Sequence, residues 1–262
     1  MRSRVGCILL LTLFVFCPLL GAAHALPQSQ RDTQPPKKES PLLNDARSVL
    51  GKVNYARAKE LTEQLQKTLR NIKAYQRDIV STRDLKRQKQ LEGMLDEEIG
   101  KAVDQTIAIL SFLQESGFED VIYKHKEELT KDFTRESLPP YEKEIFLNAG
   151  FSETDFNEFV SLFASHGHEI LVTLEKSGGV AGLKDRLGTR SARDKGKRAS
   201  RLPAYMKIFA GAVGVVGDCT IGIIVGIALP PAGAVGVVAS SAAGIAYAAD
   251  GAKMLTEQDP PR

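Results

Sequence analysis

Residues 208–249 are the stretch of sequence on which the fold depends. Residues 208–229 read IFAGAVGVVGDCTIGIIVGIAL, and Asp218 is their one charged side chain. PPAG follows at 230–233, and residues 234–249 read AVGVVASSAAGIAYAA, without any charge. Because adjacent Pro and Gly interrupt helices, the pattern predicts two apolar helices joined by a turn. The first arm has the length of a membrane-spanning helix, about 20 residues, whereas the second is short for a full span.

Small residues recur at every fourth position in both arms of this hairpin. A spacing of four places them on one ridge of a helix, where two backbones can approach closely, as they do in membrane-helix packing. The second ridge begins at Ala232 and ends at Ala248. The residues that we expect to make membrane or packing contacts are Ala210, Gly214, Asp218, Gly222, Gly226, Gly236, Ser240 and Gly244.

The two ridges resemble glycine-zipper membrane segments. The arrangement of two apolar arms around a turn is similar to the hydrophobic hairpin of pore-forming colicins. This resemblance is confined to residues 208–249 and carries no catalytic motif. It implies a hairpin that enters a membrane and forms a pore.

The composition of the first arm makes entry into lipid conditional. Its 11 Ile, Leu, Val and Phe residues favour insertion by about 5 kcal/mol in total, and Asp218 near the centre costs about 3 kcal/mol. Gly and Ala contribute little, so the balance is only slightly favourable. We therefore expect a hairpin that either stays buried in the protein or passes into lipid, with protonation of Asp218 favouring lipid.

The N-terminal residues have the pattern of a secretory signal peptide. Arg2 and Arg4 precede an apolar run from Cys7 to Leu20, and Ala23-His24-Ala25 supplies the small residues of a cleavage site. The alternative is an uncleaved anchor helix, which Pro18 and the short run disfavour. The sequence thus predicts a protein that is secreted, or extracytoplasmic and membrane-associated, whose mature chain keeps only Cys219 and forms no internal disulfide.

Basic residues are concentrated directly before the apolar hairpin. Residues 184–201 hold eight basic and two acidic side chains, a net charge of +6. Such a run is typical either of a segment attracted to anionic lipid headgroups or of a solvated linker. The run has no aromatic residue, and nucleic acid is not expected as a partner. The candidate lipid-docking residues are Arg193, Lys195, Lys197, Arg198 and Arg201.

Apolar residues at alternating spacings of three and four predict an all-α protein: a helical hairpin or bundle followed by the Gly/Ala-rich hydrophobic hairpin. We expect one amphipathic helix within residues 42–79 and a second within 85–113, packed as an antiparallel, coiled-coil-like pair. The expected segments are a signal peptide (1–25), a disordered tether (26–41), a helical domain (42–183), a basic linker (184–207), the hydrophobic hairpin (208–249) and a tail (250–262).

Sequence motifs of enzymes are missing. The chain has no HExxH, Walker A, GxSxG or CxxC motif. His166 and His168 lie two positions apart, which on a helix points their rings in different directions, so a shared metal ion is not expected. We therefore predict no enzymatic activity, no cofactor and no metal site.

These features support two hypotheses from different classes. The first is a secreted or envelope-exposed helical protein whose C-terminal hairpin interacts with an anionic membrane and forms pores. The second is a membrane-anchored structural or interaction protein that binds a partner, or a second copy of itself, through the helices of residues 42–115. Release of a dye from anionic liposomes distinguishes the first hypothesis from the second.

Overall fold

A computed structural model describes residues 40–224 and 231–257, apart from the side chains of 218–224 and 231. These residues form ten α-helices and two short 3-10 helices, without a strand in the described part, which confirms the all-α prediction. Residues 39–262 form one compact unit. The predicted signal peptide, tether residues 26–39 and Gly226 lie outside the described residues.

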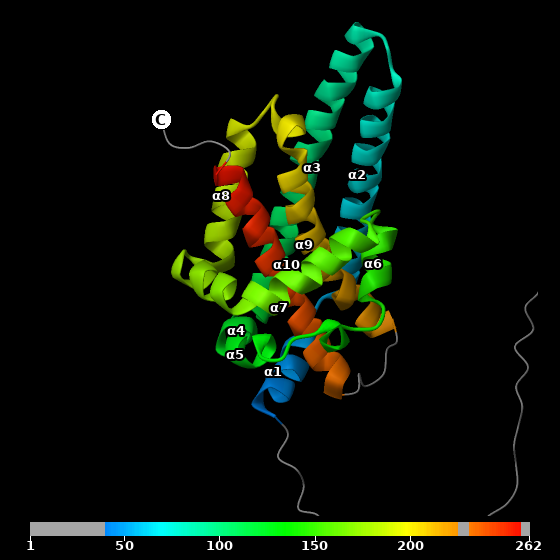
Figure 1. Ribbon diagram of the computed structural model, residues 1–262. Coiled ribbons are helices and arrows are strands. Elements are labelled where there is room, and N and C mark those ends of the chain that lie inside the picture. The colour runs from blue at the N-terminus through cyan, green and yellow to red at the C-terminus, as the bar shows by residue number, and fades with distance from the viewer. Residues whose placement is uncertain (1–39, 225–230, 258–262) are drawn as a thin grey trace, which may run out of the picture. The chain divides into compact units, whose positions relative to one another are not determined.

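Figure 1 shows the order of the helices along the chain. The 3-10 helices, Arg135–Ser137 and Arg198–Arg201, lie in the connections before α6 and α9. The α-helices are α1 (Pro41–Leu50), α2 (Tyr55–Ser81), α3 (Leu85–Ser116), α4 (Phe118–Lys124), α5 (Lys126–Thr130), α6 (Glu142–Asn148), α7 (Glu153–Lys176), α8 (Gly179–Arg193), α9 (Leu202–Ile224) and α10 (Pro231–Glu257).

The predicted antiparallel pair is present as α2 and α3, which pack against each other. The expectation of one helix across residues 42–79 is wrong, because the chain breaks between α1 and α2. The side chain of Asn54 accepts a hydrogen bond from the backbone N–H of Arg57 and caps a new helix there. At the other end of the pair, Asp84 caps α3 by accepting from the backbone N–H groups of Lys86 and Arg87.

The structure differs from the prediction of a basic linker at 184–207. Helix α8 continues through this run to Arg193, and α9 begins at Leu202. The reason is an apolar stripe that extends from the start of α8 into the basic run: Val180, Leu183 and Leu187 lie on one helix face and are buried. Only a short connection, residues 194–201, joins the two helices.

The two hydrophobic arms, α9 and α10, lie side by side in the middle of the bundle (Figure 1). Every side chain in the ranges 208–217 and 236–248 is buried. Helices α2, α3 and α6 cover α9, while α7 and α1 cover α10. The predicted hairpin domain is therefore the core of the same unit as the helical domain, because the apolar faces of the amphipathic helices have it as their packing partner.

Glycine makes the contact between α9 and α10 possible. A Cβ placed on Gly211 would lie 2.4 Å from the carbonyl oxygen of Gly244 and 2.7 Å from the amide nitrogen of Ala248. A Cβ placed on Gly244 would lie 2.5 Å from the carbonyl oxygen of Gly211. Both contacts are with backbone atoms that no rotamer change can remove, so the two helices must separate to accept any larger side chain.

This contact predicts opposite effects for the same substitution at two helical glycines. Gly211→Ala should lower the free energy of unfolding by about 1–3 kcal/mol, since overpacking outweighs the helix preference for alanine. Gly93→Ala on α3, where no atom lies within 4 Å of the new Cβ, should raise it by about 0.5–1 kcal/mol. Urea unfolding measures both, and equal effects at the two sites would contradict the close approach of α9 and α10.

Candidate functional site: the buried hairpin and its base

The seam between α9 and α10 is made by small residues on both helices. A Cβ on Gly251 would lie 3.0 Å from the carbonyl oxygen of Ala204, and a Cβ on Gly244 would lie 2.8 Å from Cγ2 of Val215. Near the other end, the buried Ser240 hydroxyl donates to the carbonyl oxygen of Gly214, at 3.1 Å. This hydrogen bond of Ser240 thus joins one arm of the hairpin to the other.

The structure places the predicted ridge residues on different surfaces. Ser240 and Gly244 lie at the seam. The open side of Gly214 faces Phe159 and Glu142, and that of Gly236 faces Pro139, so these two glycines contact the surrounding helices.

The other four ridge residues all belong to the first arm of the hairpin. Ala210 is buried and lines a small pocket beside Tyr247. Asp218 and Gly222 belong to the helical backbone of α9, but their side chains lie outside the described residues, as does Gly226 altogether. The sequence analysis did not single out Gly211 and Gly251. The available signals were the spacing of four between Gly211 and Val215 and the spacing of seven between Gly244 and Gly251.

Aromatic side chains of α6 and α7 cover the hairpin. Phe159 packs edge-on against Tyr247 of α10, with ring centroids 5.5 Å apart, and lies 4.8 Å from the ring of Phe146. The open side of Gly217 meets Ile145 of α6. A fully buried carboxyl group, Glu142, stands beside Gly214 in the same layer. Apart from this acid, the contacts named here that hold the hairpin from α6 and α7 are apolar and non-directional.

Lys207 joins both arms of the hairpin to α7. Its Nζ lies 2.7 Å from Glu158 of α7, 2.8 Å from Asp250 of α10 and 4.7 Å from the ring centroid of Tyr247. Burial alone would lower the pKa of this ammonium group, but the hydrogen bonds to Asp250 and Glu158 outweigh it and raise the pKa above its ordinary value. The two carboxylates thus favour the charged form of Lys207, which links α7 to both arms of the hairpin.

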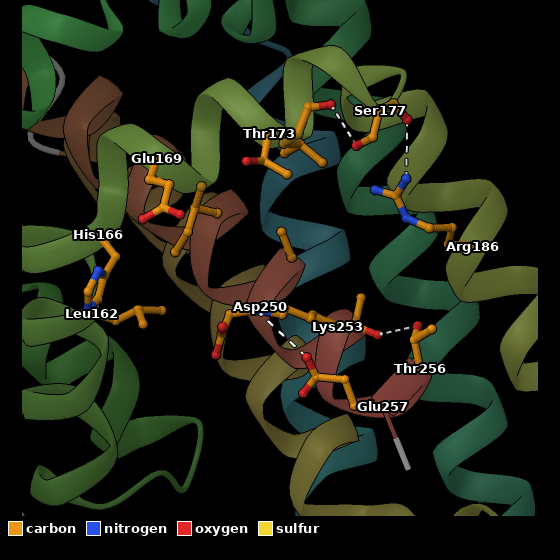
Figure 2. A pocket seen from close by; sticks show the side chains of 14 residues that line it. Leu162, His166, Glu169, Thr173, Ser177, Arg186, Asp250, Lys253, Thr256 and Glu257 are labelled. Atoms are coloured by element: carbon orange, nitrogen blue, oxygen red, sulfur yellow. Dashed lines mark hydrogen bonds and ion pairs between the residues drawn. The ribbon is translucent and has the colours of Figure 1, made fainter. Parts of the chain in front are cut away.

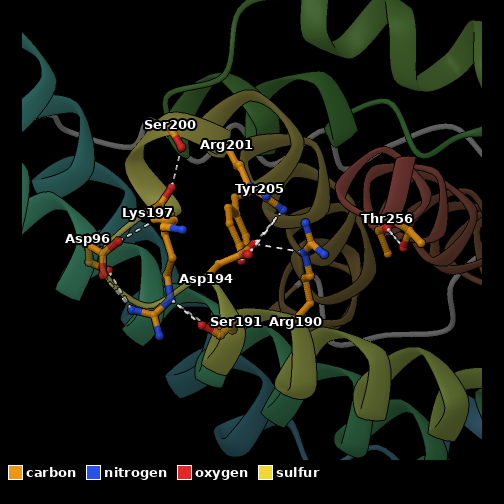
Figure 3. A network of polar contacts seen from close by, with 11 residues as sticks. Asp96, Arg190, Ser191, Asp194, Lys197, Ser200, Arg201, Tyr205 and Thr256 are labelled. Carbon is orange, nitrogen blue, oxygen red and sulfur yellow. Dashed lines mark hydrogen bonds and ion pairs between the residues drawn. The ribbon is translucent and has the colours of Figure 1, made fainter. Parts of the chain in front are cut away.

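Two buried carboxylates hold the connection that leads into α9 (Figure 3). Asp96 of α3 accepts hydrogen bonds from the backbone N–H of Gly196, at 2.9 Å, and of Arg198, at 2.7 Å. The guanidinium of Arg198 lies 3.0 Å from the same carboxylate and also donates to Ser191. Asp96 thereby fixes both the backbone and the side chain of the connection.

Asp194 is the second of these carboxylates, and its side chain is 3% exposed. It accepts from Nε of Arg190 at 3.1 Å and from the Tyr205 hydroxyl at 3.0 Å, and Arg201 lies 3.3 Å away. Tyr205 belongs to the first turns of α9. This network therefore attaches the base of the hairpin to the end of α8.

The candidate lipid-docking residues divide into two groups. Arg198 and Arg201 are engaged inside the protein by Asp96 and Asp194. Arg193, Lys195 and Lys197 are exposed, and lipid docking by these three stays a prediction. The basic run thus supplies buried ion pairs from some of its members, a role that its composition did not indicate.

A pocket of about 670 Å³ lies beside α10, between α7 and α8 (Figure 2). Ile170, Leu174 and Ala252 contribute apolar lining, and His166 and Glu169 contribute polar lining. Among the described residues, no group of three or more His, Cys, Asp and Glu side chains is placed to hold a metal ion. The pocket leaves part of the C-terminal half of α10 without close cover, and the structure assigns it no chemistry.

One helical segment among the described residues, Ala232–Glu257, is long and apolar enough to cross a membrane. Most of it is buried inside the protein. The central helix of a water-soluble protein has the same properties, so length and composition leave both environments open to α10.

Comparison with known proteins yields no relative. No protein-family model matches the chain, and neither a curated protein nor a solved structure is significantly similar to it.

The network at the base of the hairpin predicts that replacing one carboxylate with an amide strongly lowers the stability of the fold. Asp96→Asn should lower the free energy of unfolding by about 3 kcal/mol, because it leaves the guanidinium of Arg198 buried without its counter-charge. It should also expose residues 194–201 to trypsin, which cleaves after Lys and Arg.

Asp104→Asn is the matched control, since Asp104 lies on the same helix and is exposed. It should change the stability by no more than about 0.5 kcal/mol. Urea unfolding and limited trypsin digestion measure both variants. Similar results for the two would show that Asp96 does not hold the connection.

Proposed function

We propose that this chain is an exported helical protein that meets an anionic membrane from its outer side and transfers its α9–α10 hairpin from the core of the bundle into the lipid. There the hairpin perforates the bilayer, as the resemblance to colicin hairpins implies. Charged and amphipathic helices keep the apolar pair out of water until the protein reaches its target.

The close packing of α9 against α10 is the observation that carries this proposal. The seam is formed by backbone contacts at Gly211 and Gly244, and Ser240 bonds within the pair. A hairpin of this kind can leave its surroundings without breaking its own contacts. Small residues that permit close backbone approach also stabilise helix pairs inside lipid, where apolar burial no longer favours association.

The surrounding helices provide a removable cover. Phe159 and Ile145 contact the hairpin through apolar atoms, and a bilayer offers an equivalent apolar environment. The polar attachments of the hairpin lie toward its base, at Lys207 and Tyr205. Release of the hairpin therefore requires these polar attachments to be broken, while the apolar contacts are exchanged for lipid.

The predicted topology supports an approach from outside the cell or organelle. A cleaved signal peptide would place the basic run, residues 184–201, on the extracytoplasmic side. A simple stop-transfer anchor carries its positive charge on the cytoplasmic side, so α9 fits that role poorly. Burial of the hairpin in the bundle likewise disfavours the alternative, a permanently membrane-anchored interaction protein.

A disulfide between α6 and α9 tests whether the hairpin has to leave the bundle. A Cβ on Gly217 would lie 3.4 Å from Cβ of Ile145, close to the separation of about 3.5–4.5 Å found in disulfides. The double variant Ile145→Cys, Gly217→Cys is made in residues 26–262 with Cys219→Ser, a chain that retains the whole compact unit of 39–262. Its oxidised and reduced forms differ only in this bond.

We expect the reduced form to release dye from vesicles of phosphatidylcholine and phosphatidylglycerol, and the oxidised form to release little or none. Addition of a reducing agent should restore release. Equal release by both forms would show that the hairpin does not need to leave α6. No release by the reduced form, with both forms binding a partner protein, would favour the interaction protein.

A further inference from the structure

The turn between α2 and α3 is an exposed, basic end of the molecule that no other helix covers. Ile72 and Leu91 are buried, but none of the side chains between them, residues 73–90, is buried. In Figure 1 this part of the α2–α3 pair projects beyond the rest of the bundle. We call residues 77–89 the α2–α3 tip.

Two aliphatic side chains of the tip are unusually open to solvent. Val80 is 88% exposed and Leu85 is 74% exposed, the highest values among the large exposed hydrophobic residues of the described chain. They flank the turn, since α2 ends at Ser81 and α3 begins at Leu85. Both side chains are therefore open to contact with an external surface.

Positive charge surrounds these two side chains. The tip carries five basic and two acidic residues, a net charge of +3. Among the side chains that the structure describes, none forms an ion pair with any of the five basic residues, and all five are exposed. One of the acids, Asp84, is directed at the backbone as the cap of α3. The basic residues are Arg77, Arg83, Lys86, Arg87 and Lys89.

From this surface we infer that the α2–α3 tip docks the protein on an anionic lipid bilayer, with Val80 and Leu85 entering the interface and the five cations contacting headgroup phosphates. The inference rests on the proposed function in taking a membrane as the target. A convex end with aliphatic side chains at its extremity and long cationic side chains beside them suits a deformable anionic surface.

Docking at the tip is separable from entry of the hairpin. In Figure 1 the tip lies at the opposite end of the bundle from the adjoining ends of α9 and α10. Contact through the tip therefore leaves the adjoining ends of α9 and α10 away from the membrane. Binding and perforation then become two events, each with its own measurement.

Tryptophan fluorescence reports the contact directly, because the chain has no tryptophan of its own. Leu85→Trp in residues 26–262 should shift its emission to the blue on addition of vesicles that contain phosphatidylglycerol. Pure phosphatidylcholine vesicles should produce no shift. Leu147→Trp is the matched control, since Leu147 is an exposed aliphatic residue of α6, 43% exposed, and its emission should stay unchanged.

Flotation compares the two basic surfaces of the protein at equal loss of charge. Arg83→Gln, Lys86→Gln, Arg87→Gln should weaken binding to phosphatidylglycerol vesicles by roughly 10- to 100-fold. Arg193→Gln, Lys195→Gln, Lys197→Gln removes the same charge from the other basic surface and should weaken binding by less than about threefold. Because all six side chains are exposed, unchanged thermal unfolding confirms that both variants fold.

Three results would overturn the inference. The first is flotation with unchanged emission from the Leu85→Trp variant, and the second is the reverse order of the two triple variants. The third is tight binding to soluble polyglutamate without flotation, which would point to an acidic protein.

The disulfide between α6 and α9 separates this inference from the proposed function. The oxidised form should still float and, with Leu85→Trp added, still shift its emission, while it releases no dye. Docking without dye release by the reduced form would refute perforation and leave docking intact. Dye release without an emission shift would refute docking at the tip and leave perforation intact.

Discussion

The rest of the bundle depends on the backbone contact between α9 and α10 at Gly211 and Gly244. Two helices this close form a narrow apolar rod with little side-chain volume at its seam. Around that rod, the single apolar stripe of each amphipathic helix is enough to complete a core. A wider pair, with larger residues at the seam, would push α2, α3 and α7 apart and leave gaps that cost stability.

The charged residues at the base of the rod fix the position and the rotation of α9 at its start. An apolar helix with few polar side chains packs in several rotations at similar energy. Asp96 and Asp194 remove this freedom because each accepts hydrogen bonds at defined angles from residues of the connection or of α9. Buried ion pairs add little net stability by comparison with apolar contacts, but they select one arrangement.

Much of the secondary structure was predictable from the sequence, but the contacts between the helices were less predictable. The capping box at Ser152 and Asp155 and the glycine stop at Gly178 are local signals, and both are present. The pairing of Asp96 with Arg198 joins residues about a hundred positions apart, which no local pattern can reveal. Hydropathy likewise could not decide between lipid and a protein core for α10, because both environments select the same side chains. The ridge at Ala210 and Gly214 was offset from the true seam by one residue, since spacing alone does not fix which side of a helix meets its neighbour.

The central position of α9 and α10 also determines the order in which the bundle can assemble. A ribosome completes α1 to α8 before the helices that fill the space between them. Synthesis proceeds at about 5–20 residues per second. Several seconds therefore pass between completion of α8 and completion of α10, and during this time the apolar faces of the amphipathic helices lack their packing partner. Their contacts with the core join segments far apart in the chain, which slows folding further. The chain therefore reaches its compact state only after α9 and α10 have been made.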